Sequence, residues 1–224
     1  MYGISQQVVD SVIARRNKLH CIDRLEPQHT ALVVIDMQNY FLKPGFQAEI
    51  AAARAIVPTV NRAARSAREA GVKVIWIQTA ADGTDQDWSF RHQYMLGADA
   101  TSRRMTELAM GSEGFALWPD LEVDRADLKI TKRRFSAFIR GSSDLERELR
   151  ARSIDTILIC GTSTNVCCES TARDGMMLNF KTVMLADALA AQTSEAHLAS
   201  LTNCITYFSD VMSVDEACER MREK

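Results

Sequence analysis

Short runs of apolar residues recur along the chain, and segments with helical spacing of apolar positions separate them. Uninterrupted Val, Ile and Leu are typical of strands buried on both faces of a sheet. Such runs predict strands at residues 30–36, 72–77, 127–130, 156–160, 182–185 and 204–208. The remaining pattern predicts helices at residues 5–20, 50–70, 142–152 and 165–179. The alternation of the two predicts a doubly wound three-layer α/β/α fold around a mainly parallel central sheet.

The chain divides at about residue 27. Residues 1–27 are predicted to be an N-terminal helical extension, and residues 28–224 to be the main domain. The whole length is close to the upper end of what one hydrophobic core holds. We find no internal repeat and no linker rich in Pro, Gly or Ser, so one main domain is expected.

Charge and hydropathy argue against several classes of partner, although the net charge alone leaves room for a local basic patch. The formal net charge is −2, so the chain as a whole does not attract nucleic acid or an anionic membrane. No apolar run approaches the roughly 20 residues that span a bilayer. The first residues lack the continuous apolar segment of a signal peptide. We therefore expect a cytoplasmic protein that binds neither nucleic acid nor a membrane.

The cysteines are not arranged as a disulfide framework or a zinc site. No C-x-x-C pair occurs, and the four histidines are scattered. We therefore expect no structural metal, and we expect most thiols to be small apolar core residues, as at Cys160 and Cys168. The six cysteines are Cys21, Cys160, Cys167, Cys168, Cys204 and Cys218.

Three predicted strands end close to residues that carry chemistry. Asp36 ends the first strand, Lys132 follows the third, and Cys167 follows the fourth. In doubly wound sheets, ligands bind at the carboxyl ends of the strands. We therefore expect an acid, an amine and a thiol to converge there and to form a nucleophilic site.

The thiolate is the reactive form of cysteine, and this site offers ways to produce it. Cys167 is expected in the first turn of a helix, where the helix dipole and a nearby Lys132 ammonium favour the thiolate. Asp36 is placed to accept the thiol proton and to deliver it to a departing amine. The backbone amides of Ser163 and Cys167 are candidates for an oxyanion hole.

Each residue also has a plain structural interpretation. Asp36 can cap a helix, Lys132 can belong to a solvated basic run, and Cys167 can be a core thiol. A redox role for the vicinal pair Cys167–Cys168 is disfavoured because such a disulfide is strained. The chain has no complete G-x-S-x-G elbow at Gly161, no phosphate-binding G-x-x-x-x-G-K-[ST] loop and no G-x-G-x-x-G fingerprint, so a serine hydrolase and a nucleotide-binding protein are not expected.

Four stretches together resemble the isochorismatase-like cysteine hydrolases, specifically the branch with N-carbamoylsarcosine, ureidoacrylate and biuret hydrolases. The resemblance covers residues 28–212. It implies a catalytic trio of Asp36, Lys132 and Cys167. It also implies a cis peptide between Thr162 and Ser163, which presents the Ser163 amide to the oxyanion beside that of Cys167. The stretches are ALVVIDMQNYF at 31–41, KRRFSAF at 132–138, ICGTSTNVCCESTARDG at 159–175 and LADALAA at 185–191.

The resemblance implies hydrolysis of a small carbamoyl or ureido amide through a thioester, without a cofactor, by a homodimer or homotetramer. No histidine stands in the stretch 78–84, where nicotinamidases carry an Asp-x-His metal motif, which argues against a metal and against nicotinamidase activity. Two alternatives stay open: an ester or vinyl-ether hydrolase of the same fold, and a thiol-based sensor or interaction protein. Candidate substrate-binding residues, each with core packing as its alternative, are Phe41, Trp88, Phe135 and Phe138.

Overall fold

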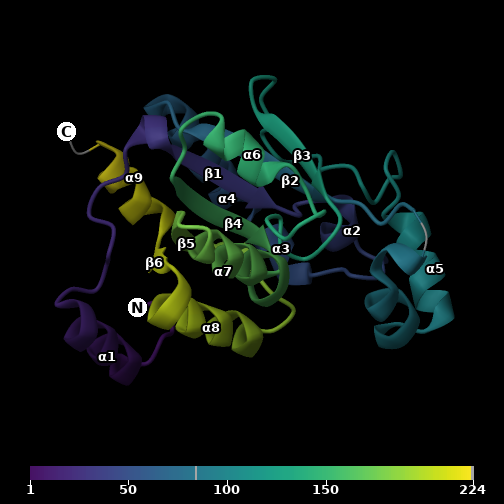
Figure 1. Cartoon of the computed structure of the whole chain (residues 1–224), viewed down its shortest axis with the longest axis horizontal. Coiled ribbons are helices and arrows are strands. Elements are labelled where there is room, and N and C mark those ends of the chain that lie inside the picture. The colour runs from purple at the N-terminus through teal and green to yellow at the C-terminus, as the bar shows by residue number, and fades with distance from the viewer. Residues whose placement is uncertain (84, 223–224) are drawn as a thin grey trace.

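The computed structural model describes residues 1–83 and 85–222, and a parallel sheet runs through the middle of this part of the chain (Figure 1). Six strands of the described residues pair in the order β3-β2-β1-β4-β5-β6, each parallel to its neighbour. The predicted doubly wound parallel sheet is therefore confirmed. The strands are β1 (Thr30–Ile35), β2 (Lys73–Thr79), β3 (Leu128–Lys132), β4 (Thr156–Thr162), β5 (Lys181–Ala190) and β6 (Asp210–Met212).

Successive side chains of the central strand β1 enter opposite cores. Leu32 and Val34 pack into the core on one face of the sheet, whereas Val33 and Ile35 pack into the core on the other. Every residue of β1 is buried, because the strand lies between β2 and β4 and beneath helices on both faces. Because β1 is buried on both faces, its sequence is an almost continuous run of apolar residues.

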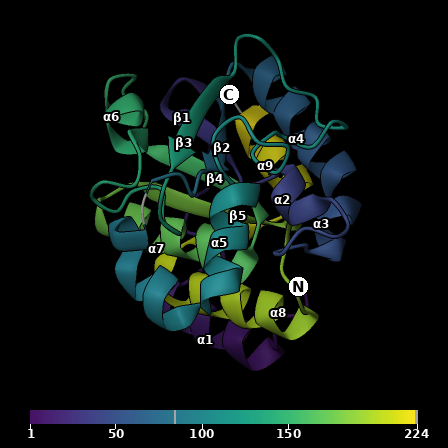
Figure 2. The same cartoon turned by 90° about the vertical axis from the view of Figure 1, so that its right-hand side faces the viewer.

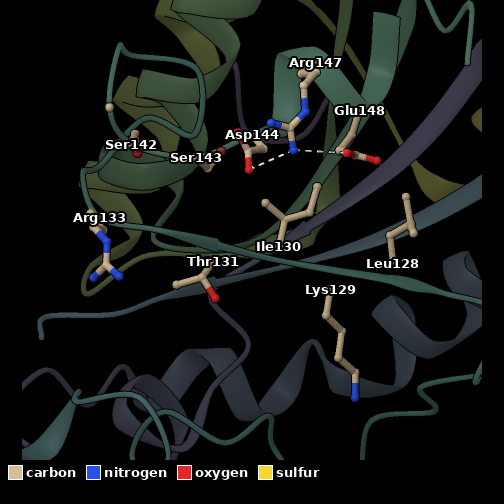
Figure 3. A pocket seen from close by; sticks show the side chains of 11 residues that line it. Leu128, Lys129, Ile130, Thr131, Arg133, Ser142, Ser143, Asp144, Arg147 and Glu148 are labelled. Carbon is tan, nitrogen blue, oxygen red and sulfur yellow. Dashed lines mark hydrogen bonds and ion pairs between the residues drawn. The ribbon is translucent and has the colours of Figure 1, made fainter. Parts of the chain in front are cut away.

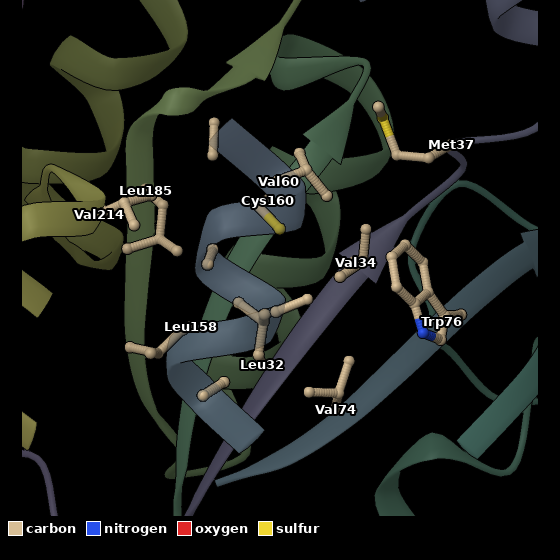
Figure 4. Packing of buried hydrophobic residues seen from close by; sticks show 14 of the residues in the cluster. Leu32, Val34, Met37, Val60, Val74, Trp76, Leu158, Cys160, Leu185 and Val214 are labelled. Carbon is tan, nitrogen blue, oxygen red and sulfur yellow. The ribbon is translucent and has the colours of Figure 1, made fainter. Parts of the chain in front are cut away.

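One face of the sheet is covered by α3 (Ala51–Ala55), α4 (Val57–Ala70) and α9 (Val214–Arg222). Figure 4 shows Val60 of α4 and Val214 of α9 against this core. The single helix predicted at 50–70 is wrong in one respect, since it divides at Ile56 into α3 and α4. Pro58 lies in the first turn of α4, where its missing N–H is tolerated.

The other face carries four helices among the described residues: α1 (Gln6–Arg16), α6 (Leu145–Arg150), α7 (Glu169–Met177) and α8 (Ser194–Asn203). The N-terminal helix α1 packs on its own chain. Val9 and Val12 enter the core, and Nη2 of Arg16 donates to the carbonyl oxygen of Ile205 at 2.6 Å. The extension is thus fixed by apolar and polar contacts.

The strand predicted at 204–208 is wrong. Cys204–Phe208 is a wide helical turn that continues α8, and the edge strand is β6, a few residues later. Cys204 and Ile205 are both buried although they are adjacent, which is a helical and not an alternating burial pattern. A short apolar and β-branched run does not by itself distinguish a strand from a buried helical segment.

The carboxyl ends of the strands point toward one end of the molecule, where α2 (Asn39–Leu42) and α5 (Ala98–Glu107) lie. Figure 2 looks onto this end, with α5 in front of the sheet. None of the helices formed by residues 1–83 and 85–222 is long and apolar enough to cross a membrane.

Candidate active site

The carboxylate of Asp36 is fixed at the end of β1. Its backbone adopts a left-handed conformation with φ of 55°, a region in which Asp is tolerated better than most residues. The amide of Asp36 donates to the carbonyl oxygen of Ile77 at 2.9 Å, so β2 holds the turn. The side chain is fully buried, and Oδ1 accepts a hydrogen bond of 2.7 Å from Oγ1 of Thr79.

Lys132 ends β3, two strands away from β1, and reaches back to Asp36 across the end of β2. Its Nζ lies 2.9 Å from Oδ2 of Asp36, and neither side chain is exposed. The same Nζ donates to Oγ1 of Thr79 and, at 3.1 Å, to the carbonyl oxygen of Arg134. The hydroxyl of Thr79 therefore accepts from the lysine and donates to the carboxylate.

A buried amide side chain fixes the position of Thr79. Nε2 of Gln38 donates to the carbonyl oxygen of Thr79 at 3.0 Å, and the Thr79 amide donates to Oε1 of Gln38 at 2.7 Å. A further hydrogen bond of 2.9 Å joins Nε2 of Gln38 to the carbonyl oxygen of Phe115. The segment 36–39 thus contains both the acid, Asp36, and the residue that aligns β2, Gln38.

The thiol of Cys167 comes from the turn that follows β4. Gly161, with φ of 107°, lies against β1, and a Cβ at this position would collide with the carbonyl oxygen of Ile35. One residue further along the chain, the peptide bond between Thr162 and Ser163 is cis. The wide helical turn Thr164–Cys168 then leads into α7 and brings Cys167, which is 5% exposed, to Asp36 and Lys132.

The electrostatics of the thiol differ from the sequence-based expectation. Burial first, and the charge of Asp36 second, raise the pKa of Cys167 to about 12, although Lys132 acts in the opposite sense. Burial by itself lowers the pKa of the Lys132 ammonium, but the charge of Asp36 first, and the neighbouring Cys167 second, raise it above its ordinary value. The resting site therefore holds a neutral thiol beside an Asp36–Lys132 ion pair.

Such an arrangement can transfer a proton without creating net charge. When Asp36 takes the thiol proton, the negative charge moves from the carboxylate to sulfur, and Lys132 remains beside it. The charge of Asp36 acts directly on the Cys167 thiol, so the carboxylate is placed as the candidate general base for it. The site can therefore form the Cys167 thiolate in a buried environment by this proton transfer.

The four aromatic candidates divide into two groups. Trp88 and Phe135 contact each other edge to face, with ring centroids 4.8 Å apart, and Phe135 lies three residues after Lys132. Phe41 packs into the core on the α4 face, and Phe138 stacks on Phe180 in the other core, with centroids 5.2 Å apart. The structure brings the first two together and not the second two.

The basic residues after Lys132 have local partners. Arg133 forms an ion pair with Asp82, and the guanidinium of Arg134 lies 5.3 Å from the centroid of the Trp88 ring. Arg140 is exposed to solvent. Arg133 also borders a surface hollow of about 490 Å³ between β3 and α6, which Figure 3 shows to be lined by Leu128, Ile130 and Arg147 among others. None of the three converging catalytic candidates lines this hollow.

The sequence pattern missed two residues of the site. Thr79 is the last residue of β2 and Gln38 stands two positions after Asp36. Both residues could have been found from their positions, because they are polar and lie at or just after the end of a central strand. These strand ends meet at one edge of the sheet. No group of three or more His, Cys, Asp or Glu side chains that could hold a metal ion occurs in the described part of the chain.

Comparisons with known proteins cover most of this chain. Residues 30–216 match the family model described as an isochorismatase domain. The chain is 33% identical over 209 residues to "Ureidoacrylate amidohydrolase RutB" of Stutzerimonas stutzeri (strain A1501), which covers 87% of this chain and 84% of that protein. Among solved structures, a cysteine hydrolase from Pseudomonas syringae pv. phaseolicola 1448A is similar with a TM-score of 0.81 and 30% identity, covering 91% of this chain and 97% of that one. N-carbamoylsarcosine amidase from Thermoplasma acidophilum shares the fold, with a TM-score of 0.66 and 22% identity over 83% of this chain and 96% of that one.

Proposed function

The chain belongs to the isochorismatase family, and from that premise we propose that it hydrolyses the amide bond of a small carbamoyl or ureido compound through Cys167. As a member with amidohydrolase relatives, it is a hydrolase of carbon–nitrogen bonds other than peptide bonds. One observation carries the finer proposal: Asp36, Lys132 and Cys167 meet in a buried cluster at the carboxyl ends of β1, β3 and β4.

The first half of the reaction forms a thioester. Asp36 accepts the proton of Cys167, and the thiolate attacks the carbonyl carbon of the substrate, forming a C–S bond. The backbone N–H groups of Ser163 and Cys167 donate hydrogen bonds to the developing oxyanion. The C–N bond then breaks, and the proton held by Asp36 moves to the departing nitrogen, which leaves as ammonia or an amine.

The second half consumes water and restores the site. Water attacks the thioester carbon while Asp36 takes a proton from it, and the C–S bond breaks. The sulfur regains its proton from Asp36, and the product leaves as an acid. Lys132 keeps its positive charge throughout, beside the carboxylate in one state and beside the thiolate in the next.

The choice of a carbamoyl or ureido substrate is supported by two features. Relatives over most of the chain are named ureidoacrylate amidohydrolase, at 33% and 34% identity. The nucleophile is a thiol, which suits an acyl transfer from nitrogen to sulfur. Cys168, which follows the nucleophile directly, is fully buried and serves as a packing residue.

The test measures ammonia release from a panel of small amides: ureido acids, carbamoyl amino acids, biuret and nicotinamide. Wild type is expected to release ammonia from at least one ureido or carbamoyl compound, and Cys167→Ala from none. Cys168→Ala is the matched control and is expected to keep activity. Mass spectrometry of the acid-quenched reaction is expected to find an acyl group on Cys167. Retained turnover in Cys167→Ala would contradict the proposal.

A further inference from the structure

Helix α8 packs against the turn Thr164–Cys168, which carries the thiol of Cys167. Two side chains of this helix bind the first residue of the turn. Nδ1 of His197 lies 2.9 Å from Oγ1 of Thr164, and Oγ of Ser200 donates to the carbonyl oxygen of Thr164 at 3.2 Å. His197 and Ser200 are three positions apart and therefore lie on one face of the helix. This face of α8 thus holds both the side chain and the carbonyl group of Thr164.

The burial of Thr164 determines which of the two side chains donates. Thr164 is fully buried, and its hydroxyl has no other hydrogen-bond acceptor among residues 1–83 and 85–222. If Nδ1 of His197 carried the hydrogen, the hydroxyl proton would be buried without an acceptor, which is costly. Burial also lowers the pKa of His197, which keeps the ring neutral at pH 7. The hydroxyl of Thr164 therefore donates to Nδ1, and the ring carries its hydrogen on Nε2.

The other surroundings of His197 lie away from the catalytic trio. The residue is half-buried and lines a surface hollow of about 260 Å³, together with Gln192 and Thr193 of the segment that precedes α8. None of the three catalytic residues lines this hollow. His197 is therefore placed to act on the reaction through Thr164 and not on the reacting atoms themselves.

Both backbone N–H groups that the proposed mechanism assigns to the oxyanion belong to the stretch around Thr164. Ser163 directly precedes Thr164, and Cys167 follows it by three residues. The amides of Val166 and Cys168 donate to the carbonyl oxygen of Ser163 at 3.1 and 3.2 Å, so a displacement at the start of the turn is passed to its end. Donors stabilise an oxyanion most when they are fixed in place before the charge develops.

We propose that His197 is a positioning residue of the reaction, which acts through the hydroxyl of Thr164 to hold the amide of Ser163 and the thiol of Cys167 in place. This inference rests on the proposed function and extends it to α8, a helix that carries none of the catalytic trio. The oxyanion forms only after the substrate is bound. A less firmly held turn therefore lowers kcat and leaves KM unchanged.

Ammonia release is measured for wild type and variants on the ureido or carbamoyl compound of the panel that wild type hydrolyses. His197→Phe keeps a ring but removes the acceptor, so kcat is expected to fall about threefold to tenfold with KM unchanged, the effect of losing one hydrogen bond. His197→Asn offers an oxygen near the position of Nδ1 and is expected to recover most of kcat. The matched control is His29→Phe, which is expected to change neither constant. Nδ1 of His29 also makes a hydrogen bond, of 2.7 Å to the carbonyl oxygen of Ser153, but at the amino end of β1.

The outcomes separate this inference from the proposed function. A kcat in His197→Phe equal to that of wild type, or a change confined to KM, would overturn the positioning role and leave the proposed function standing. No release by wild type from any compound would contradict the proposed function, and the positioning role with it.

A double-mutant cycle tests whether His197 acts through Thr164. Thr164→Val removes the hydroxyl and is expected to lower kcat by a factor similar to that of His197→Phe. The double variant is expected to be no slower than either single one, because both remove the same hydrogen bond. A kcat reduced by the product of the two factors would overturn the assignment to Thr164. Circular dichroism confirms that each variant is folded. If Thr164→Val does not fold, equal kcat in His197→Phe and His197→Asn would still overturn the proposal.

Discussion

Nζ of Lys132 lies 2.9 Å from Oδ2 of Asp36, and both side chains are completely buried. The pair joins the ends of β1 and β3, which are separated in the sheet by β2. Two opposite charges that are buried away from water attract each other more strongly than an exposed pair does. Each of them also becomes a costly unpaired charge if the other is removed. The chemistry of the site and the stability of the sheet edge are therefore coupled through this contact.

Replacement of Lys132 by Met is expected to abolish activity and to destabilise the protein. The remaining Asp36 carboxylate would be buried without a counter-charge, which costs about 3–5 kcal/mol. Urea unfolding followed by circular dichroism measures this loss. A cost below about 1 kcal/mol, the range of an exposed ion pair, would contradict the buried geometry.

The double variant Asp36→Asn, Lys132→Met serves as the control for that prediction. Because it removes both charges, it is expected to be more stable than Lys132→Met alone and equally inactive. A double variant no more stable than the single one would mean that the two residues are not coupled through their charges. In that case Lys132 would stabilise the fold through packing alone.

Thr79 is expected to act as a positioning residue between Asp36 and Lys132. Thr79→Val keeps the shape but removes the hydroxyl that donates to the carboxylate and accepts from the ammonium. The loss of one such hydrogen bond, about 1.4 kcal/mol, predicts a kcat about tenfold lower with KM little changed. Thr79→Ser restores the hydroxyl and is expected to recover most of kcat; failure of this rescue would assign a packing role to Thr79.

The sequence predicted most of the sheet and the three central residues because each depends on a local signal. Double burial makes β1, β2 and β4 continuous apolar runs, and the carboxyl ends of parallel strands meet at one edge. Those two facts made Asp36, Lys132 and Cys167 candidates, and the family resemblance selected them as a catalytic trio. The family resemblance added the cis peptide at Thr162, which the residues alone do not indicate.

Other features depend on contacts between distant segments and leave little trace in the sequence. The turn at 204–208 is helical because its buried residues are adjacent on one face of a continuing helix. His197 lies in a segment without a recognisable motif, and only the folded chain brings it to Thr164. Likewise, the raised pKa of Cys167 results from burial, which the sequence does not specify.

The pKa of Cys167 predicts a loss of stability at alkaline pH. The thiol titrates near 9.0 in the unfolded chain and at about 12 in the folded protein. The contribution of the Cys167 thiol to the free energy of unfolding is therefore fully present below pH 9. It is lost as the pH rises toward 12, because the unfolded chain releases the proton first. One such group lowers the free energy of unfolding by about 1.4 kcal/mol per pH unit in that window.

Urea unfolding of wild type and Cys167→Ala between pH 7 and pH 10.5 measures this contribution. The difference between the two free energies of unfolding is expected to be constant up to about pH 9 and then to change by about 1.4 kcal/mol per pH unit, with wild type losing more. Two curves that stay parallel over the whole range would show that the folded thiol titrates like that of the unfolded chain.

Gly161 is expected to tolerate no side chain, because it combines a positive φ with close approach to β1. A Cβ there meets the backbone of Ile35 directly before Asp36, and backbone cannot move aside as a flexible side chain can. Gly161→Ala is therefore expected to destabilise the protein by more than the roughly 1–2 kcal/mol that a left-handed backbone conformation costs a residue with a Cβ. Activity in the folded fraction is expected to fall as well, since the shift moves the loop that carries Cys167.

Gly45 provides the matched control for this last prediction. Its φ is 90°, similar to that of Gly161, but a Cβ on Gly45 has no atom within 4 Å. Gly45→Ala therefore carries only the conformational cost, and the excess loss in Gly161→Ala measures the collision with β1. Equal losses of stability in the two variants would mean that β1 and β4 separate easily at this point, and that the position of Asp36 beside the Cys167 loop does not depend on their close approach.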